Sequence, residues 1–245
     1  MNLDRLETSR LVHRFGFGPR VGEFTTYLKQ GVPATRASLL TVPSVDLGLA
    51  SITLPTFTDL GKRPEPNNTE IIPFIVGMKT QTENLISWWM DRMALGDNGL
   101  TERMTWFWHG HWATSYSKIN EPLVMFDHIA RLRKNAVGDF SLMCEEMVLD
   151  GGLIYWLDGQ LNTANSPNEN LSRELLELFT LGVNNYSETD VKEAAKALSG
   201  LRVVKSSGVV TKDPRRSYVG TSTILGTTGN FESATLARFL SLTAA

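Results

Sequence analysis

The sequence has a single cysteine, Cys144, and almost no net charge. One cysteine excludes an intramolecular disulfide and a zinc site built from several cysteines. Cys144 lies in an apolar helical pattern, which is typical of a buried, unreactive thiol. A formal net charge of −2 provides no large cationic field, so nucleic acid is not the expected partner.

Long apolar runs are also missing. No stretch reaches ~18 uninterrupted apolar residues, so we expect no transmembrane helix. The first residues lack the cationic start and apolar run of a secretory signal, and we therefore expect a cytoplasmic chain. Walker loops, serine-hydrolase elbows, zinc-protease helices and dinucleotide fingerprints are absent, so no standard motif identifies a reaction.

Helical patterning is what the sequence does contain. Apolar residues recur at helical spacing over most of the chain, beginning with two or three short helices in residues 5–40. β-branched residues on both sides of Ser-Ser-Gly predict a hairpin within residues 201–230, which also hold a Gly/Thr-rich tail. We predict a mainly α fold: one multi-helix, orthogonal bundle-like domain over residues 1–245 with a small C-terminal β-hairpin.

Residues 41–67 depart from this pattern because they contain four prolines and show little periodicity. Such a composition predicts a long surface loop that lies across the domain as a lid or a strap. Beyond this loop, Thr82 is expected to cap a helix that reaches Ala94. Thr101 is expected to cap the next helix, which Gly110 would end in a left-handed conformation.

The most complete helix pattern covers residues 166–182, SPNENLSRELLELFTLG. Ser166 is the expected N-cap, Pro167 the first helical residue and Glu169 the third, as in a capping box. Gly182 is the expected end. At about 100° per residue, one apolar face is formed by Leu171, Leu175, Leu178 and Phe179.

Four polar groups surround that apolar face. Glu169, Arg173 and Glu177 follow one another at four-residue spacing, which is typical of a solvated ladder of ion pairs. Glu174 instead falls at the margin of the core, where a carboxylate needs an arginine, a histidine, backbone donors or a metal as its partner. A structural network and a catalytic or metal-binding role are both open for Glu174.

Two histidines flank a glycine in the aromatic run WFWHGHW. In a continuous helix His109 and His111 point about 200° apart and cannot share an ion. If the helix ends at His109, Gly110 allows a turn that brings both imidazoles to one side. In the alternative, the tryptophans pack in the core and the histidines bind helix-end carbonyl groups.

The motifs RLVHRFGFGP, LTERMTWFWHGHW, PNENLSRELLELFTLG and LGTTGNF occur in this order. Together they resemble the bacterial domain of unknown function 1800 family, over most of residues 8–232. The resemblance implies a largely helical fold and no settled activity. Relatives are often longer by about a second half and often carry a twin-arginine export signal. The resemblance therefore identifies a short, truncated form that lacks both.

The first functional hypothesis is an enzyme with a polar or metal centre. His109, His111, Glu174 and then Glu177 would hold a divalent transition metal, namely zinc, manganese or iron. The catalytic set would be Glu174, Arg173 and His111, with a carboxylate as general base and Arg173 or Arg103 neutralising an anionic group of a small-molecule substrate. Hydrolysis and a redox step both fit.

The second hypothesis is a non-catalytic interaction module. The Glu–Arg–His set is then a structural network, and an exposed helical face docks a second protein chain, including another copy in a homo-oligomer. Measurement of bound metal and of the oligomeric state separates the two hypotheses.

Overall fold

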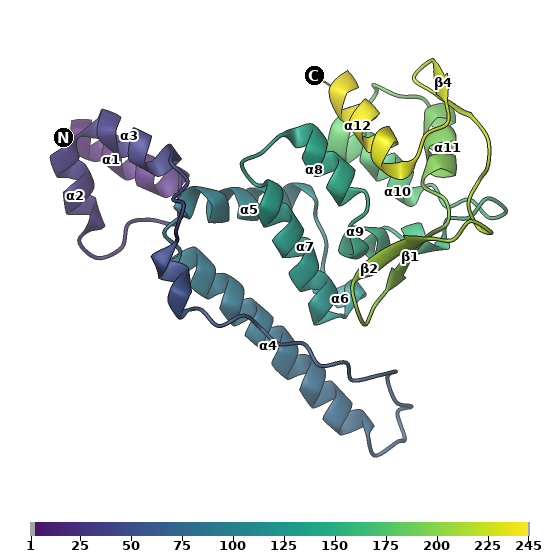
Figure 1. Cartoon of the computed structure of the whole chain (residues 1–245), viewed down its shortest axis with the longest axis horizontal. Coiled ribbons are helices and arrows are strands. Elements are labelled where there is room, and N and C mark those ends of the chain that lie inside the picture. The colour runs from purple at the N-terminus through teal and green to yellow at the C-terminus, as the bar shows by residue number, and fades with distance from the viewer. Residues whose placement is uncertain (1–2, 245) are drawn as a thin grey trace. The chain divides into compact units, whose positions relative to one another are not determined.

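Residues 3–244 are described by the structure, a computed structural model (Figure 1). The chain divides into two units, residues 1–107 and 108–245, and each is described by itself below. The described chain is mainly helical with two short antiparallel hairpins, so the predicted fold class is confirmed. That all of it forms one domain stays a prediction. No helix of residues 3–244 has the length and hydropathy needed to span a bilayer.

Three short helices open the first unit, as residues 5–40 predict. Its elements are α1 (Leu3–Arg14), α2 (Glu23–Gln30), α3 (Val32–Leu40), the 3-10 turn η1 (Leu47–Ser51), α4 (Ile71–Leu95) and the start of α5 (Gly99–His111). Apart from η1, residues 41–67 form neither helix nor strand. We call residues 41–67 the strap.

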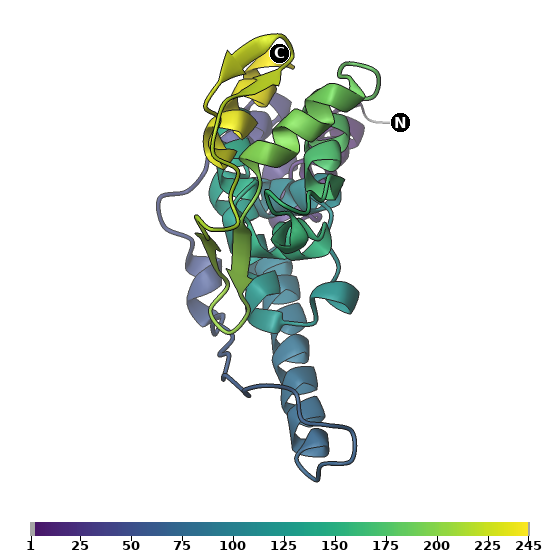
Figure 2. The ribbon, with the colours of Figure 1, turned by 90° about the vertical axis from the view of Figure 1, so that its right-hand side faces the viewer.

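The strap runs beside α4 in both views of the ribbon (Figures 1 and 2). The Thr58 N–H and carbonyl exchange hydrogen bonds with the Gln81 side-chain amide at 3.0 and 3.2 Å. Leu60 packs on Gly77, where an added Cβ would lie 2.8 Å from the leucine Cδ1. A glycine at position 77 therefore lets the strap approach the helix closely.

Helix α4 is longer than the sequence predicts, and the expected cap at Thr82 is wrong. Residues 71–81 are already helical, and the Thr82 hydroxyl donates to the Met78 carbonyl at 2.8 Å, one turn back in the same helix. Pro73 lies in the first turn, where its missing N–H costs no intrahelical hydrogen bond. The helix therefore begins at Ile71, after a short turn that follows the strap.

Both expected ends of α5 are also wrong. Asn98, rather than Thr101, is the cap, since its side-chain oxygen accepts the Thr101 N–H at 3.1 Å. Gly110 lies within the helix, and the ladder continues beyond it because the Trp112 N–H donates to the Trp108 carbonyl at 2.7 Å. Indole packing at these positions outweighs the helix-breaking tendency of one glycine.

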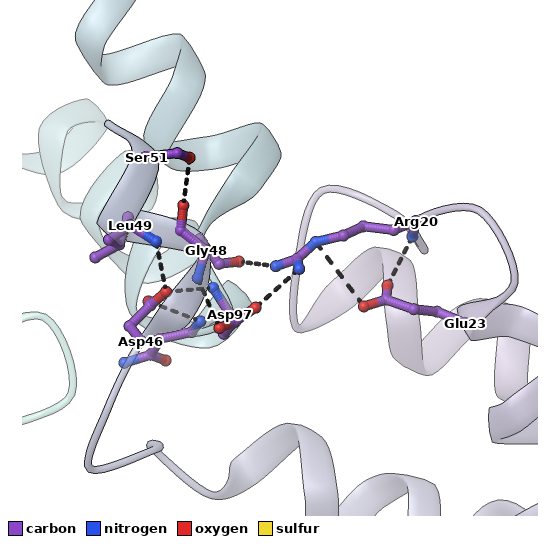
Figure 3. Close-up of polar contacts among 9 residues, drawn as sticks. Arg20, Glu23, Asp46, Gly48, Leu49, Ser51 and Asp97 are labelled. Atoms are coloured by element: carbon purple, nitrogen blue, oxygen red, sulfur yellow. Dashed lines mark hydrogen bonds and ion pairs between the residues drawn. The ribbon is translucent and has the colours of Figure 1, made fainter. Parts of the chain in front are cut away.

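Two aspartates tie the strap to the junction of α4 and α5, and we call them the aspartate clasp (Figure 3). Asp46 accepts the N–H groups of Asp97 and Asn98 at 2.8 and 3.2 Å. Asp97 accepts the Gly48 N–H and an Arg20 guanidinium N–H, both at 2.8 Å. These two hydrogen bonds, that of Gly48 first, lower the pKa of Asp97. The clasp thus supplies N–H groups at a helix start with carboxylate acceptors.

The second unit contains the end of α5 and all later elements. These are α6 (Tyr116–Ile119), α7 (Pro122–Asn135), α8 (Phe140–Met147), α9 (Gly151–Trp156), the 3-10 turn η2 (Gly159–Leu161), α10 (Asn170–Glu174), the π-helix η3 (Leu175–Thr180), α11 (Glu188–Ala197), β1 (Leu201–Val204), β2 (Val209–Lys212), β3 (Ser222–Ile224), β4 (Thr227–Gly229) and α12 (Ser233–Thr243).

The second unit closes around one apolar core. α12 packs along α8, α7 packs on α8 and α9, and α11 packs on β3. β1 and β2 pair antiparallel with Val204 opposite Val209, as the β-branched pattern predicts. Cys144 is fully buried, as its apolar pattern predicts, and burial raises the pKa of its thiol to about 12. Core side chains include Trp112, Leu132, Met143, Met147, Leu153, Ile154, Leu171, Leu175, Leu176, Phe179, Leu198, Leu236 and Leu240.

The helix expected to begin at Pro167 begins at Asn170, so the capping box at Ser166 is wrong. Ser166 and Thr163 instead form a bridge, with both N–H groups donating to the opposite carbonyl at 3.2 and 3.1 Å. The Asn162 side chain accepts the Asn168 N–H at 3.1 Å and holds this turn. Asparagine side chains thus compete with the helix for the same backbone groups.

The end of this stretch is a π-helix, which the sequence does not predict. The Leu181 N–H donates to the Leu176 carbonyl, five residues back, at 2.9 Å. The wider turn shifts the apolar face, so Leu178 is 58% exposed whereas Leu176 is fully buried. The prediction that Leu178 belongs to the apolar face is therefore wrong. The expected end at Gly182 agrees with a φ of +84°.

Candidate functional site

Arg173 lies between two carboxylates. Its guanidinium donates to both Glu188 oxygens at 2.7 and 2.8 Å and to Glu169 at 3.4 Å. These contacts, above all the Glu188 hydrogen bonds, raise the pKa of Arg173. The geometry is that of a bidentate ion pair at the surface, the arrangement that a structural ladder gives.

Glu177 and Glu174 follow on the next turn. Glu177 accepts a short hydrogen bond from the Tyr186 hydroxyl. Glu174 is half-buried and makes no hydrogen bond or ion pair within residues 3–244. Burial, and then the charge of Glu177, raise the pKa of Glu174, while Arg173 lowers it. The core-margin carboxylate that the sequence singles out thus lacks the expected partner here, and its catalytic or metal-binding role stays a prediction.

His111 lies among aromatic rings at the end of α5. Its Nε2 is 3.3 Å from the carbonyl oxygen of Phe179, in the last turn of the π-helix. Because a carbonyl can only accept, this nitrogen donates. Burial lowers the pKa of His111, and the Phe179 hydrogen bond opposes the shift. His111 therefore binds a helix-end carbonyl, as the second reading of the histidine pair expects.

His109 and His111 point to different sides of α5 and cannot share an ion. α5 is helical through both residues, so the condition for a shared ion, a helix that ends at His109, is not met. The His109 ring instead meets the ring of His128 edge to face, with centroids 5.5 Å apart. Burial, and then the charge of His128, lower the pKa of His109 to about 4, so both imidazoles of α5 are neutral near pH 7.

His128, on α7, forms a buried pair with Asp150. The His128 Nδ1 is 2.7 Å from Asp150 Oδ1, and the two side chains are 0% and 1% exposed. Since the carboxylate accepts, Nδ1 carries the hydrogen of this bond, and Nε2 lies on the far side of the ring from Asp150. Within the part of the chain that the structure describes, this buried Nε2 has no hydrogen-bond partner.

Asp150 is held in place from three sides. Its Oδ1 accepts the Leu153 N–H at 2.8 Å, which caps the start of α9. Its Oδ2 lies 3.5 Å from the Nε of Arg131. At Gly152, an added Cβ would lie 3.1 Å from Asp150 Oδ1 and 3.4 Å from His128 Cβ. The glycine therefore lets α9 approach α7 closely enough for the pair to form.

A groove of about 650 Å³ is lined by Arg131 but by neither His128 nor Asp150. Such a volume is in the range of small-molecule sites. Burial, and then the charge of Asp150, raise the pKa of Asp127 at its wall. Arg131 belongs both to the groove and to the contacts of Asp150. The other lining residues come from α7, α8 and the residues after it, the β1–β2 turn and β2: Ala130, Lys134, Glu146, Leu149, Ser207, Gly208, Val209 and Val210.

Sequence reasoning missed the His128–Asp150 pair although both residues carry signals. His128 lies on the apolar face of α7 with Val124 and Leu132, where an imidazole requires a partner. Asp150 is a helix cap, and the two residues that follow it are glycines without side chains. Neither signal specifies the other residue, since they are 22 positions apart.

A ready-made metal site is absent from residues 3–244, because no group of three or more His, Cys, Asp or Glu side chains is placed to hold an ion. Catalytic zinc sites commonly use three protein ligands. His109 and His128 together supply two. The zinc, manganese or iron expected from the sequence stays a prediction that elemental analysis tests.

The family is established by comparison. A family model described as "Protein of unknown function (DUF1800)" matches residues 10–245. No curated protein and no solved structure matches the chain. The match confirms the resemblance that the tryptophan-flanked histidines and the PNEN segment indicate. It spans nearly the entire sequence, and the chain therefore belongs to the DUF1800 family.

Proposed function

We propose that the chain is a hydrolytic enzyme in which His128, oriented by Asp150, is the general base. The observation that carries this proposal is the fully buried imidazole with one nitrogen on a carboxylate and the other without a partner. An unsatisfied buried acceptor costs about 1–3 kcal/mol. Most buried side-chain polar atoms in proteins have a hydrogen-bond partner, so the bare Nε2 supports a reactive role.

The carboxylate supplies what a general base needs. Asp150 fixes the tautomer that directs the Nε2 lone pair away from it, and its charge stabilises the imidazolium formed after proton transfer. Because His128 is fully buried, the proposed step requires an opening that admits water and substrate to Nε2. Nε2 then takes a proton from water while the oxygen of that water attacks the substrate carbonyl or phosphoryl group. The proton then passes to the leaving group, and no redox partner is required.

The groove supports a small-molecule substrate with an anionic group. Arg131 and Lys134 line it, and Arg131 also approaches Asp150. Lys134 is paired with Glu146 at 2.5 Å and Arg131 with Asp150 at 3.5 Å, and the planar guanidinium is the group that can also hold an anion through two hydrogen bonds. The role that the sequence analysis gives to Arg173 or Arg103 is assigned here to Arg131.

The first test compares wild type and His128→Gln on a panel of chromogenic carboxylate and phosphate esters. Loss of the base is expected to reduce kcat by roughly 10²- to 10⁴-fold. His13→Gln is the matched control, because His13 is an exposed histidine whose Nδ1 binds the Ser9 carbonyl of its own helix. Full activity of His128→Gln contradicts the proposal.

A second test needs no substrate. Histidine ¹⁵N NMR of the wild type is expected to show His128 as the Nδ1–H tautomer, and Asp150→Ala to abolish that preference. An Nε2–H tautomer in the wild type contradicts the assignment. Elemental analysis of the purified chain tests for a metal. Stoichiometric zinc, manganese or iron that is lost in His109→Ala and His128→Ala would contradict the metal-free step and indicate a metal-assisted one.

A further inference from the structure

One face of α4 is apolar and exposed over most of its length. Ile72, Val76, Ile86 and Met90 are 68%, 56%, 53% and 60% exposed. Leaving four large side chains on one helix in water is unfavourable, since burial contributes about 0.8 kcal/mol per methylene group. Contiguous exposed apolar surface on a soluble chain marks a site of association.

The exposed side chains follow a heptad spacing. Together with Lys79 and Glu83, the four apolar residues occupy positions separated by 4, 3, 4, 3 and 4 residues. At about 100° per residue, all six lie within ~40° of one line along the helix. Alternating three- and four-residue steps are the pattern by which two helices pack side by side. We call these six residues the α4 stripe.

The opposite face of α4 is already covered within the first unit. Gln81 and Gly77 contact the strap through Thr58 and Leu60. Leu85, Trp88 and Arg92 are the buried residues of this helix. The strap therefore protects one side of the helix and leaves the α4 stripe uncovered.

The α4 stripe is symmetric about position 81. If two copies of α4 pair antiparallel around that point, Ile72 faces Met90 of the partner subunit, and Val76 faces Ile86 of the partner subunit. Lys79 then faces Glu83 of the partner subunit, and the reverse pair forms as well. A parallel pair in register would place Lys79 on Lys79 and Glu83 on Glu83, which repel.

We propose that the chain forms a two-fold symmetric dimer through antiparallel pairing of the α4 stripe with that of a second copy. The charges favour a second copy of the chain as the partner, because the stripe is complementary to itself only in the antiparallel direction. Lys79 and Glu83 are 73% and 61% exposed and lie 3.7 Å apart in one helix, so both are free to turn toward a second chain.

Sedimentation velocity of the full chain over a range of concentrations tests the dimer. Lys79→Glu alone and Glu83→Lys alone are each expected to weaken dimerisation at least tenfold, since each places like charges together twice. The double variant Lys79→Glu/Glu83→Lys is expected to recover it. Asp91→Lys is the matched control, an equal charge change on an exposed residue of α4 outside the stripe.

Cysteine cross-linking tests the direction. An equimolar mixture of Val76→Cys and Ile86→Cys chains is expected to form the mixed disulfide, whereas a parallel pair would link position 76 to position 76. The native Cys144 is fully buried and does not compete. A chain that stays monomeric, single charge reversals without effect, or a 76–76 link each overturns the proposal. Circular dichroism of every variant confirms that α4 is retained.

Discussion

Asp46 in the first unit and Asp150 in the second both supply a carboxylate to N–H groups at the start of a helix. Asp46 lies at the surface and accepts only backbone N–H groups, those of Leu49, Asp97 and Asn98. Asp150 is buried and also binds an imidazole. Backbone N–H groups alone satisfy the surface carboxylate of Asp46. The buried carboxylate of Asp150 also requires a titratable side chain, His128, as a partner in the core.

The same contrast holds for the apolar cores. Among the described residues of the first unit, only Val12, Leu85 and Trp88 are fully buried apolar side chains, and all others of that kind lie in the second unit. Hydrogen bonds such as those of the aspartate clasp therefore contribute a larger share of the stability of the first unit. The second unit has a core that can compensate the burial of polar groups.

The largest effect is expected from Asp150→Ala, which leaves His128 and Arg131 without their buried partner. Breaking a buried pair typically costs about 3–5 kcal/mol of unfolding free energy. Urea denaturation measures the loss, and hydrogen exchange locates it in the second unit. Asp150→Asn, which keeps a side-chain acceptor for the Leu153 N–H, is the milder control. If Asp150→Ala loses less than ~1 kcal/mol of unfolding free energy, the buried Asp150 contributes no more than the surface carboxylate of Asp46.

Acid is expected to destabilise the chain through His109. The folded pKa is about 4, below the ordinary 6.5, so the unfolded chain binds more protons between these values. This contribution is complete above pH ~6.5 and is lost as the pH falls toward 4, by about 3 kcal/mol in total. His109→Gln should flatten the profile between pH 7.5 and 5 in urea denaturation, and His13→Gln should not. Equal slopes in both variants would contradict the prediction.

A smaller and more local effect is expected from Asp46→Ala. Losing a capping carboxylate costs about 1–2 kcal/mol. Hydrogen exchange should accelerate at the N–H groups of Asp97 and Asn98, while the N–H of Leu153 in the second unit stays protected. Asp46→Asn should retain part of the protection because its amide oxygen still accepts. If Leu153 exchanges faster as well, the two units do not respond separately.

The smallest effect is expected from Arg173→Ala. Its bidentate pair with Glu188 is solvent-accessible, and such pairs contribute little. The melting temperature should fall by about 2 °C or less, and raising the salt concentration in the wild type should give a similar change. A much larger fall in the melting temperature would indicate that the polar groups of residues 166–182 do more than form ion pairs at the surface.

Much of the fold could be predicted because it follows from local periodicity. The three opening helices and the hairpin around residues 205–208 depend on patterns within a few residues. The wrong helix ends occur at residues whose cap or stop signals are not used. The Thr82 hydroxyl donates within its own helix, Gly110 lies inside α5, and Ser166 pairs with Thr163 in a turn.

The candidate site was less predictable because its parts are distant in sequence. The proximity of His109 and His111 in the chain suggested a pair, but α5 separates their rings and brings His109 to His128. Asp150 comes from a third helix. Packing of α7 on α9 creates this arrangement, and no pattern within a single helix specifies it.

The π-helix at Leu175–Thr180 contains one residue more than an α-helical turn between the same two neighbouring segments would contain. Removing exposed Leu178 would shorten the span of the Leu181–Leu176 hydrogen bond from five residues to four, which is the α-helical value. The buried leucines at 171 and 175 precede the turn and would keep their places. This segment is therefore a place where the chain can change its length by one residue without giving up its core.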